Sequence, residues 1–230
     1  MQDWQRHVRV WWHSLVVADQ AGALVLRGSG AGFLRFLFLT IALLYAVYGF
    51  SMGLFAGVLP AFVSMLKLPA LYLCSITVSV PSLYALNCLL GPRLHFDQCL
   101  RLVLLSISAN AVALGSYAPV SYFFVLTSYE STYFFLIMMH VAVFALSGFL
   151  SVGVILMISR ATARVGGTPF CPGIMLAWGI IYGLVGSQMS WFLRPWVGSP
   201  AEAYTLFRPI QSSFLETLWR LVLELLGMQP

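Results

Sequence analysis

Five apolar runs, each of about 20 residues or more, constrain the fold of this chain more than any other feature. They cover residues 33–57, 69–90, 100–126, 131–159 and 174–193. About 20 apolar residues are needed to cross a hydrocarbon core that is roughly 30 Å thick. The runs are continuous and do not alternate as the strands of a membrane barrel do, so each is expected to be a helix. The sequence therefore predicts five transmembrane helices.

Composition points to the same class, because 60% of the 230 residues are hydrophobic and only 8% are charged. In soluble domains roughly a quarter of the residues are charged. We predict an all-α fold, a polytopic membrane helix bundle of five transmembrane helices with amphipathic interfacial helices at both ends. The expected parts are an N-terminal interfacial helix over residues 1–30, the membrane domain over 31–194, and a turn with a last interfacial helix over 195–230.

The N-terminal segment has the pattern of a helix that lies in the headgroup layer. At 100° per residue, one face carries Trp4, Val8, Trp11 and Leu15, and the opposite face carries Arg6 and Arg9. Tryptophans opposite bases favour a helix against anionic lipid, although a helix that docks on a partner protein would show the same pattern. The net charge of +5 fits attraction to anionic lipid, and no pattern typical of nucleic-acid binding is present.

The stretch GSQMSWFLRPWVGSP, residues 186–200, ends the fifth apolar run with a base and a proline. We expect Arg194 to reach lipid phosphate while Trp191 and Trp196 lie in the interfacial layer. A capping box at Ser213 opens a last amphipathic helix, which is too short to span and is expected along the non-cytoplasmic surface or against the bundle. Arg194 is then either a simple interfacial anchor or the residue that holds this tail over the bundle.

Small residues recur at a spacing of four in two of the predicted spans. They are Gly49, Gly53 and Gly57 in the first span and Gly179 and Gly183 in the fifth. Such stripes let another helix approach closely, within the chain or between copies. We therefore predict packing interfaces at these five glycines.

The distribution of bases predicts the orientation of the chain. Eight of the 12 Lys and Arg residues flank the N-terminus and the second and fourth connections: Arg6, Arg9, Arg27, Arg35, Arg93, Arg101, Arg160 and Arg164. The other side has the remaining four, including Lys67, which the predicted boundaries put between the first two spans. The excess predicts a cytoplasmic N-terminus and a C-terminus on the opposite side.

Candidate chemistry within the spans is sparse. No carboxylate, lysine or arginine falls at the centre of a predicted span, where such a residue would indicate a proton or ion pathway. His140 and Ser147 share a helix face, but two turns separate their side chains by roughly 10 Å, too far for a hydrolase dyad. His140 is favoured as a hydrogen-bonding group between helices and is otherwise a weak candidate ligand for a pigment or haem.

The cysteines do not form a recognisable site, because Cys74, Cys88, Cys99 and Cys171 are scattered. Neither a zinc site nor a disulfide framework is indicated. We therefore expect no catalytic residue, no metal and no cofactor.

Several longer stretches resemble a known family. They are LKLPALYLCSITVSVPSLYALNCLLG, GSYAPVSYFFVLTS, GSQMSWFLRPWVGSP and YTLFRPIQSSFLETL, within residues 66–218. Together they are similar to bacterial multi-pass proteins grouped with the Yip (Ypt-interacting protein) family. The resemblance implies five membrane helices and a cytosolic N-terminus. We expect the protein to lie in a bacterial inner membrane. Members of the family's eukaryotic branch bind small GTPases. This chain lacks the D-L-Y-G-P type motif of the Golgi members, so the resemblance is used to predict the fold and not a GTPase partner.

The function expected from these features is that of a non-catalytic scaffold or accessory subunit of a larger membrane complex. Its partners would be the lipid bilayer and other membrane proteins or further copies of the chain. The alternative is a channel or transporter for a neutral or lipid-like substrate, with breaks at Pro81 and Pro119 as a gate. A membrane-embedded lipid-modifying enzyme is a third hypothesis, which no motif supports.

Overall fold

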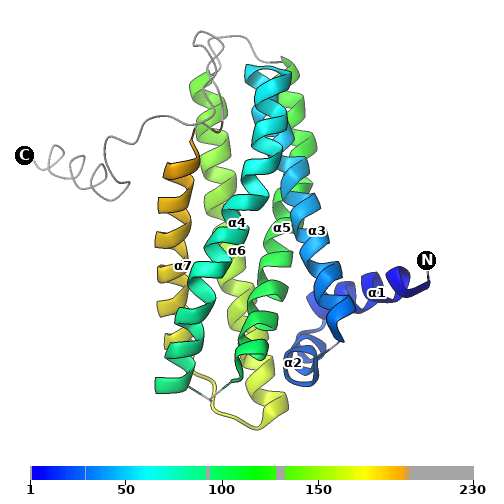
Figure 1. Ribbon diagram of the computed structural model, residues 1–230, viewed down its shortest axis with the longest axis vertical. Helices are drawn as coiled ribbons and strands as arrows, with labels where there is room; N and C mark the ends of the chain where they lie inside the picture. Colours follow the sequence, from blue (N-terminus) through cyan, green and yellow to red (C-terminus); the bar gives the residue numbers. More distant parts are fainter. Residues whose placement is uncertain (1, 29, 92–93, 128–132, 195, 197–230) are drawn as a thin grey trace, which may run out of the picture.

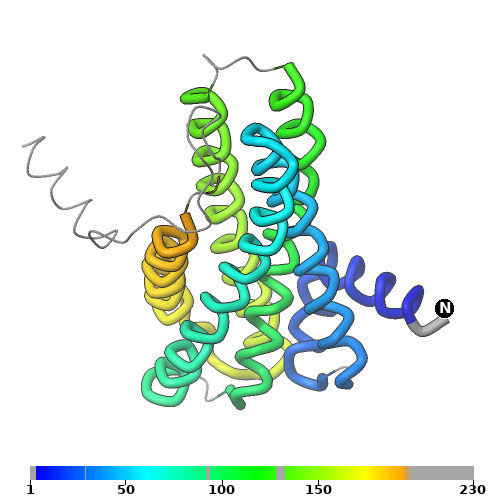
Figure 2. The backbone as a smooth tube through the Cα atoms, turned by 45° about the horizontal axis from the view of Figure 1, so that its top comes forward, coloured from blue at the N-terminus to red at the C-terminus, as the bar shows by residue number. Residues whose placement is uncertain are grey.

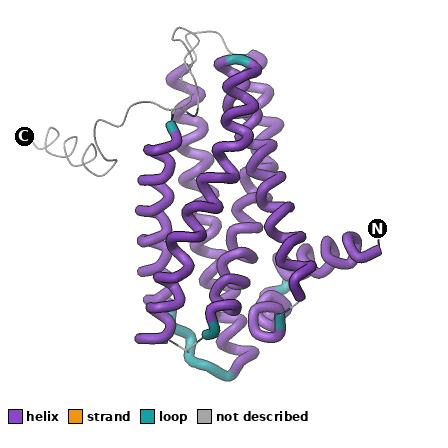
Figure 3. The backbone as a smooth tube through the Cα atoms, in the orientation of Figure 1, coloured by secondary structure: helices purple, strands orange, loops and turns teal. Residues whose placement is uncertain are grey.

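The computed structural model describes residues 2–28, 30–91, 94–127, 133–194 and 196, and throughout these residues the regular structure is helical (Figure 3). The elements are α1 (Gln2–Val16), α2 (Ala18–Arg27), α3 (Gly30–Gly53), a short 3-10 turn η1 (Leu54–Ala56), α4 (Val58–Leu90), α5 (Phe96–Thr127), α6 (Tyr133–Gly166) and α7 (Pro172–Leu193). Five of them, from α3 with η1 through α7, are long and apolar enough to cross a membrane. The all-α bundle predicted from the sequence is confirmed, and the chain is a multi-pass membrane protein.

The five long helices run side by side (Figure 1). α3 packs against both α4 and α5, α5 packs against α6, and α7 packs mainly against α4. α6 and α7 contact each other little, although they follow one another in the chain. α1 and α2 lie at the end of the bundle where α3 begins, and α1 runs across the bundle axis (Figures 1 and 2).

The boundary predicted for the second span is wrong. α4 begins at Val58, directly after Gly57, whose φ of 119° is readily available only to glycine. Its 33 residues continue through Pro69 and Pro81, because the remaining helix and its neighbours support the turns where proline removes an N–H donor. Lys67 is therefore part of α4, 6% exposed, and not a base of a connecting loop.

The length of α4 explains how a lysine fits within it. At 1.5 Å per residue α4 is about 50 Å long, well beyond the roughly 30 Å of hydrocarbon. Lys67 lies about 14 Å from the Val58 end and about 11 Å from the middle of the helix, in the half of α4 that begins at Val58. α5 and α6, with 32 and 34 residues, are similarly long, and α6 extends to Gly166.

The N-terminal region forms two helices where the sequence predicted one. The chain breaks at Val17, which has extended backbone angles. α1 packs on α3 through the rings of Trp4 and Phe36, and the buried Trp11 donates its indole N–H to Ser108 Oγ of α5 at 2.9 Å. Trp11 therefore packs against the bundle, whereas the prediction directed it at lipid headgroups.

α2 packs closely on α6. A Cβ added at Gly22 would lie 2.7 Å from the backbone of Ala161 and Thr162, so only glycine fits there. An ion pair between Arg164 and Asp19, at 3.0 Å, joins the same two helices. This contact makes α2 a structural part of the bundle end.

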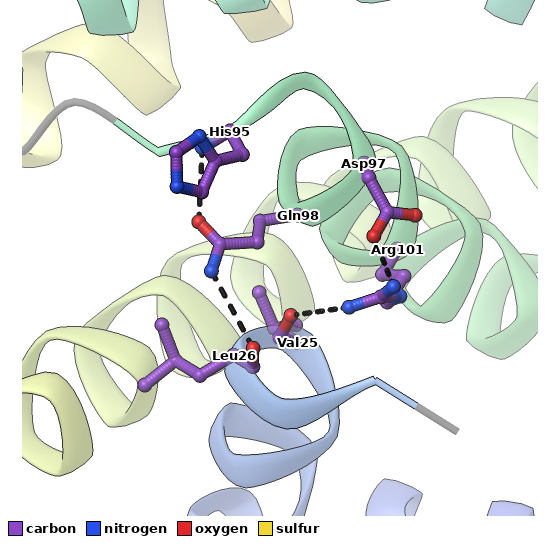
Figure 4. Close-up of polar contacts among 6 residues, drawn as sticks. All are labelled: Val25, Leu26, His95, Asp97, Gln98 and Arg101. Carbon is purple, nitrogen blue, oxygen red and sulfur yellow. Dashed lines mark hydrogen bonds and ion pairs between the residues drawn. The ribbon is translucent and has the colours of Figure 1, made fainter. Parts of the chain in front are cut away.

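The C-terminus of α2 is held by the first turn of α5, as Figure 4 shows. Arg101 Nη1 donates to the carbonyl of Val25 at 3.2 Å, and Gln98 Nε2 donates to that of Leu26 at 3.4 Å. Asp97 pairs with the same Arg101 guanidinium. The last carbonyls of a helix lack partners within it, so these two side chains cap α2.

The predicted C-terminal interfacial helix, including its capping box at Ser213, lies outside the described residues.

Candidate functional site

A cavity of about 390 Å³ lies between α4, α5, α6 and α7. Tyr72 of α4, Asn110 of α5, Ser151 of α6, and Trp178 and Tyr182 of α7 are among the residues that line it. Tyr72 and Tyr182 lie near the middle of their helices, so the cavity lies at mid-height of the bundle. Its volume falls within the range of small-molecule sites in proteins.

Glycines create this space. A Cβ added at Gly148 of α6 or Gly183 of α7 would meet no atom within 4 Å, and one at Gly179 would meet only Val152, at 3.9 Å. Gly148, Gly183 and the neighbouring Phe149 are exposed, so the cavity opens sideways between α6 and α7, toward the bilayer. Gly179 and Gly183, predicted as packing positions, line this cavity without close backbone approach by another described helix.

The cavity is mostly apolar but contains hydroxyl groups. Ser151 Oγ and Tyr182 Oη are buried and have no hydrogen-bond partner within the described part of the chain. A buried polar group without a partner costs about 1–3 kcal/mol. The indole of Trp178 donates to the carbonyl of Ser79 at 2.8 Å and stacks on Tyr182, with ring centroids 5.3 Å apart. The described residues that line the cavity include no charged side chain.

A polar network fixes one wall of the cavity. Tyr45 Oη of α3 donates to Asn110 Oδ1 of α5 at 2.8 Å, and Asn110 Nδ2 donates to the carbonyl of Ser147 of α6 at 2.8 Å. The rings of Tyr45 and Tyr72 stack with centroids 3.8 Å apart. Four helices, α3, α4, α5 and α6, are thereby joined behind the cavity, and Asn110 and Tyr72 are held in place on its surface.

His140 lies elsewhere in the core. It is buried on α6, and its Nδ1 is 2.8 Å from Tyr48 Oη of α3. Its Nε2 is also buried, with no partner among the residues the structure describes, and the ring is not part of the cavity wall. The contact joins α3 and α6. In the described residues, no group of three or more His, Cys, Asp or Glu side chains could hold a metal ion.

Two glycines of the first predicted stripe lie against α4. A Cβ at Gly49 would be 2.5 Å from the carbonyl oxygen of Ser64, and one at Gly53 would be 2.6 Å from that of Pro60. Gly57 has a different place, because it forms the turn between η1 and α4.

The residues proposed to anchor the end of α7 contact one another and α4. The Arg194 guanidinium lies over the ring of Trp191, 3.7 Å from its centroid. Trp196 donates its indole N–H to the carbonyl of Ser190 at 3.0 Å, and its own carbonyl accepts from Ser64 Oγ at 2.9 Å. Trp196 is thus half-buried against the bundle, and its predicted place in the interfacial layer stays a prediction.

The bases predicted to contact lipid from the N-terminal segment are at the surface. Arg6 and Arg9 are both exposed on α1. Arg9 also lines a shallow depression of about 400 Å³ together with His13 and Arg27. This arrangement leaves their side chains available to anionic groups.

The sequence did not single out Tyr72, Ser151, Trp178 or Tyr182. A usable signal was the spacing of four between Trp178 and Tyr182 and between Gly179 and Gly183, because residues four apart are neighbours on one face of a helix. Comparisons of the chain with protein-family models, with curated proteins and with solved structures found no match. The resemblance to Yip proteins stays a prediction.

Proposed function

We propose that this protein binds a neutral, largely apolar molecule in the central cavity, as a carrier or transporter does, and that it makes or breaks no bond. The observation that carries the proposal is the pair of buried hydroxyls, Ser151 Oγ and Tyr182 Oη, which have no partner among the described residues and lie at a mostly apolar cavity. A ligand with a hydroxyl or carbonyl group would supply those partners.

The class of ligand follows from the walls of the cavity and from its opening. An ion would be poorly stabilised, because the described lining holds no charged side chain, is mostly apolar and lies at mid-height of the bundle. The sideways opening beside Gly148 and Gly183 favours a molecule that enters from the bilayer. The substrate class is thus a neutral lipid-like molecule with one polar group.

Quantitative mass spectrometry of molecules extracted with the purified protein tests this proposal. Gly148→Leu and Gly183→Leu place a side chain in the cavity at positions where a Cβ meets no atom, so both variants should fold. We expect each to lower the amount of the co-extracted neutral molecule per protein by about tenfold, which corresponds to about 1.4 kcal/mol.

Matched controls exist on the same two helices. A Cβ at Gly153 of α6 or at Gly173 of α7 also meets no atom within 4 Å, and neither residue lines the cavity. Gly153→Leu and Gly173→Leu should retain the bound molecule. Equal loss in all four variants, or no neutral molecule in the wild-type extract, would reject a ligand in this cavity.

A second candidate function, that of a scaffold or accessory subunit, is supported by the position of Gly179 and Gly183. No described helix approaches their backbone closely, so a helix of another subunit or a second copy could pack there. Gly179→Leu would then reduce the mass of the complex measured by light scattering in detergent. A wild-type protein that is monomeric and copurifies with no protein would exclude this candidate.

We further propose that the protein lies in a bacterial inner membrane with its N-terminus in the cytoplasm. The excess of bases near α1, α2 and the connections at the same end of the bundle supports this orientation. The likeness to Yip-family proteins noted in the sequence supports the choice of membrane.

A further inference from the structure

A second, larger hollow lies on another part of the bundle, between α3, α4 and α5. It has a volume of about 680 Å³ and shares no lining residue with the central cavity. We call it the lipid-facing groove and define it by Arg35 and Leu39 of α3, Ile76 and Thr77 of α4, and Leu100 of α5. The remaining lining residues are apolar.

The groove exists because α4 packs closely against α3 at one end only. Gly49 and Gly53 hold α3 against the first turns of α4, at Ser64 and Pro60. Further along, α4 packs against α7 and makes few contacts with α5. The groove occupies this diverging half, from residue 73 to residue 81 of α4 and from residue 96 to residue 104 of α5.

Its shape suits a hydrocarbon chain. Eight residue steps along α4 or α5 correspond to about 12 Å. Apolar side chains from three helices form its walls, and Leu39, at 61% exposed, marks its open side toward the lipid. A water-soluble ligand would gain little binding free energy in such a groove. An acyl chain would leave the bulk lipid and make van der Waals contacts with a surface of matching shape.

Arg35 gives the groove a polar end. It is exposed and is the one charged side chain among the described residues that line the groove. It lies about 8 Å along α3 from Gly30, at the end of the bundle where α2 lies and α5 begins (Figure 1). A guanidinium at this level matches the phosphate of a lipid whose chain lies in the groove.

We propose that the lipid-facing groove binds one glycerophospholipid, with an acyl chain along Leu39, Ile76 and Leu100 and its phosphate on Arg35. This site is independent of the central cavity and of the function proposed for it. An anionic headgroup is preferred, because the bases at this end of the bundle attract net negative charge.

Native mass spectrometry of the intact protein with phosphatidylglycerol titrated into detergent tests the site. Arg35→Gln should weaken binding by about fivefold, the effect of about 1 kcal/mol for one base near a membrane surface. Leu39→Trp, which narrows the groove from its exposed side, should weaken the same binding. Both changes are at exposed positions, so the fold is expected to persist.

Two controls match these variants. Leu43→Trp changes a residue of the same helix that is 64% exposed and does not line the groove, and Arg6→Gln removes an exposed base of α1. Both should bind phosphatidylglycerol as the wild type does. Binding that Arg35→Gln and Leu39→Trp leave unchanged overturns the proposal, as does equal weakening by the controls.

Two further probes separate the parts of the ligand. Glycerol 3-phosphate carries the phosphate without the chains, and diacylglycerol carries the chains without the phosphate. We expect each to bind more weakly than phosphatidylglycerol. If glycerol 3-phosphate binds equally well, the site is one for free phosphate; if diacylglycerol does, Arg35 has no role in it. Either result contradicts the proposal.

Discussion

Gly49 and Gly53 set the distance between α3 and α4. At both positions an added Cβ would lie under 3 Å from backbone atoms of α4, which cannot move aside as a flexible side chain can. The same contact fixes the divergence of α4 that opens the lipid-facing groove. The absence of a side chain at Gly49 and Gly53 thereby determines the shape of one face of the bundle.

Gly49→Ala and Gly53→Ala should each destabilise the protein by about 1–3 kcal/mol, the usual cost of excess volume in a packed interior. Thermal unfolding in detergent measures this. Gly153→Ala is the control, because its Cβ meets no atom, and it should be neutral or more stable by about 0.5–1 kcal/mol. Equal unfolding temperatures for all three variants would contradict the close approach.

Spacing alone could predict the stripe at Gly49 and Gly53 but not its partner. Gly179 and Gly183 have the same spacing and line a cavity instead. A period of four shows which face of a helix is flat, whereas what lies opposite depends on the packing of the whole chain. The hydroxyls of Ser151 and Tyr182 were missed for the same reason, since their lack of partners among the described residues is a property of the assembled bundle.

At the scale of elements, α2 links the N-terminal region to the membrane domain. It contacts α6 at Gly22, pairs through Asp19 with Arg164, and is capped by Arg101 of α5. An amphipathic pattern predicted an apolar face for this region, but it could not distinguish lipid from protein as the cover. The break in the helix at Val17 could not be predicted from the sequence either, because neither glycine nor proline lies there.

Gly22→Leu should release α2 from α6, because the leucine would overlap the backbone at Ala161. Hydrogen exchange of the amides of α2 should become about tenfold faster or more, given a cost of about 1–3 kcal/mol for the overlap. Gln20→Leu, an exposed change on the same helix, should leave exchange unaltered. Protection that persists in Gly22→Leu would show that α2 does not depend on this contact.

At the scale of the whole molecule, the composition and the apolar runs were sufficient to predict an all-α membrane bundle. The start of α4 was misplaced because Lys67 and Pro69 resemble a connection, whereas α4 is about 50 Å long and contains both within its first half. The arrangement of the helices decides the cavity. Since α7 packs on α4 and makes few contacts with α6, the bundle is open between α6 and α7. No local sequence pattern predicts this opening.

Cysteine reporters test the topology. Reporters at Gln20 and Pro169, both exposed, should be labelled from the cytoplasmic side, and one at Val58 from the opposite side. The native residues Cys74, Cys88, Cys99 and Cys171 are replaced in this background. Labelling of positions 20 and 58 from the same side would be incompatible with the bundle.

The central claim is that a cavity at mid-height of the bundle opens to lipid between α6 and α7. It is tested most directly by paramagnetic broadening of a small fluorine label in bilayers that carry a nitroxide at mid-chain. A label on Ser151→Cys should broaden nearly as much as one on Leu150→Cys, which is 48% exposed, and far more than one on Ser79→Cys, which is 0% exposed. A label at position 151 as protected as the one at position 79 would contradict the claim.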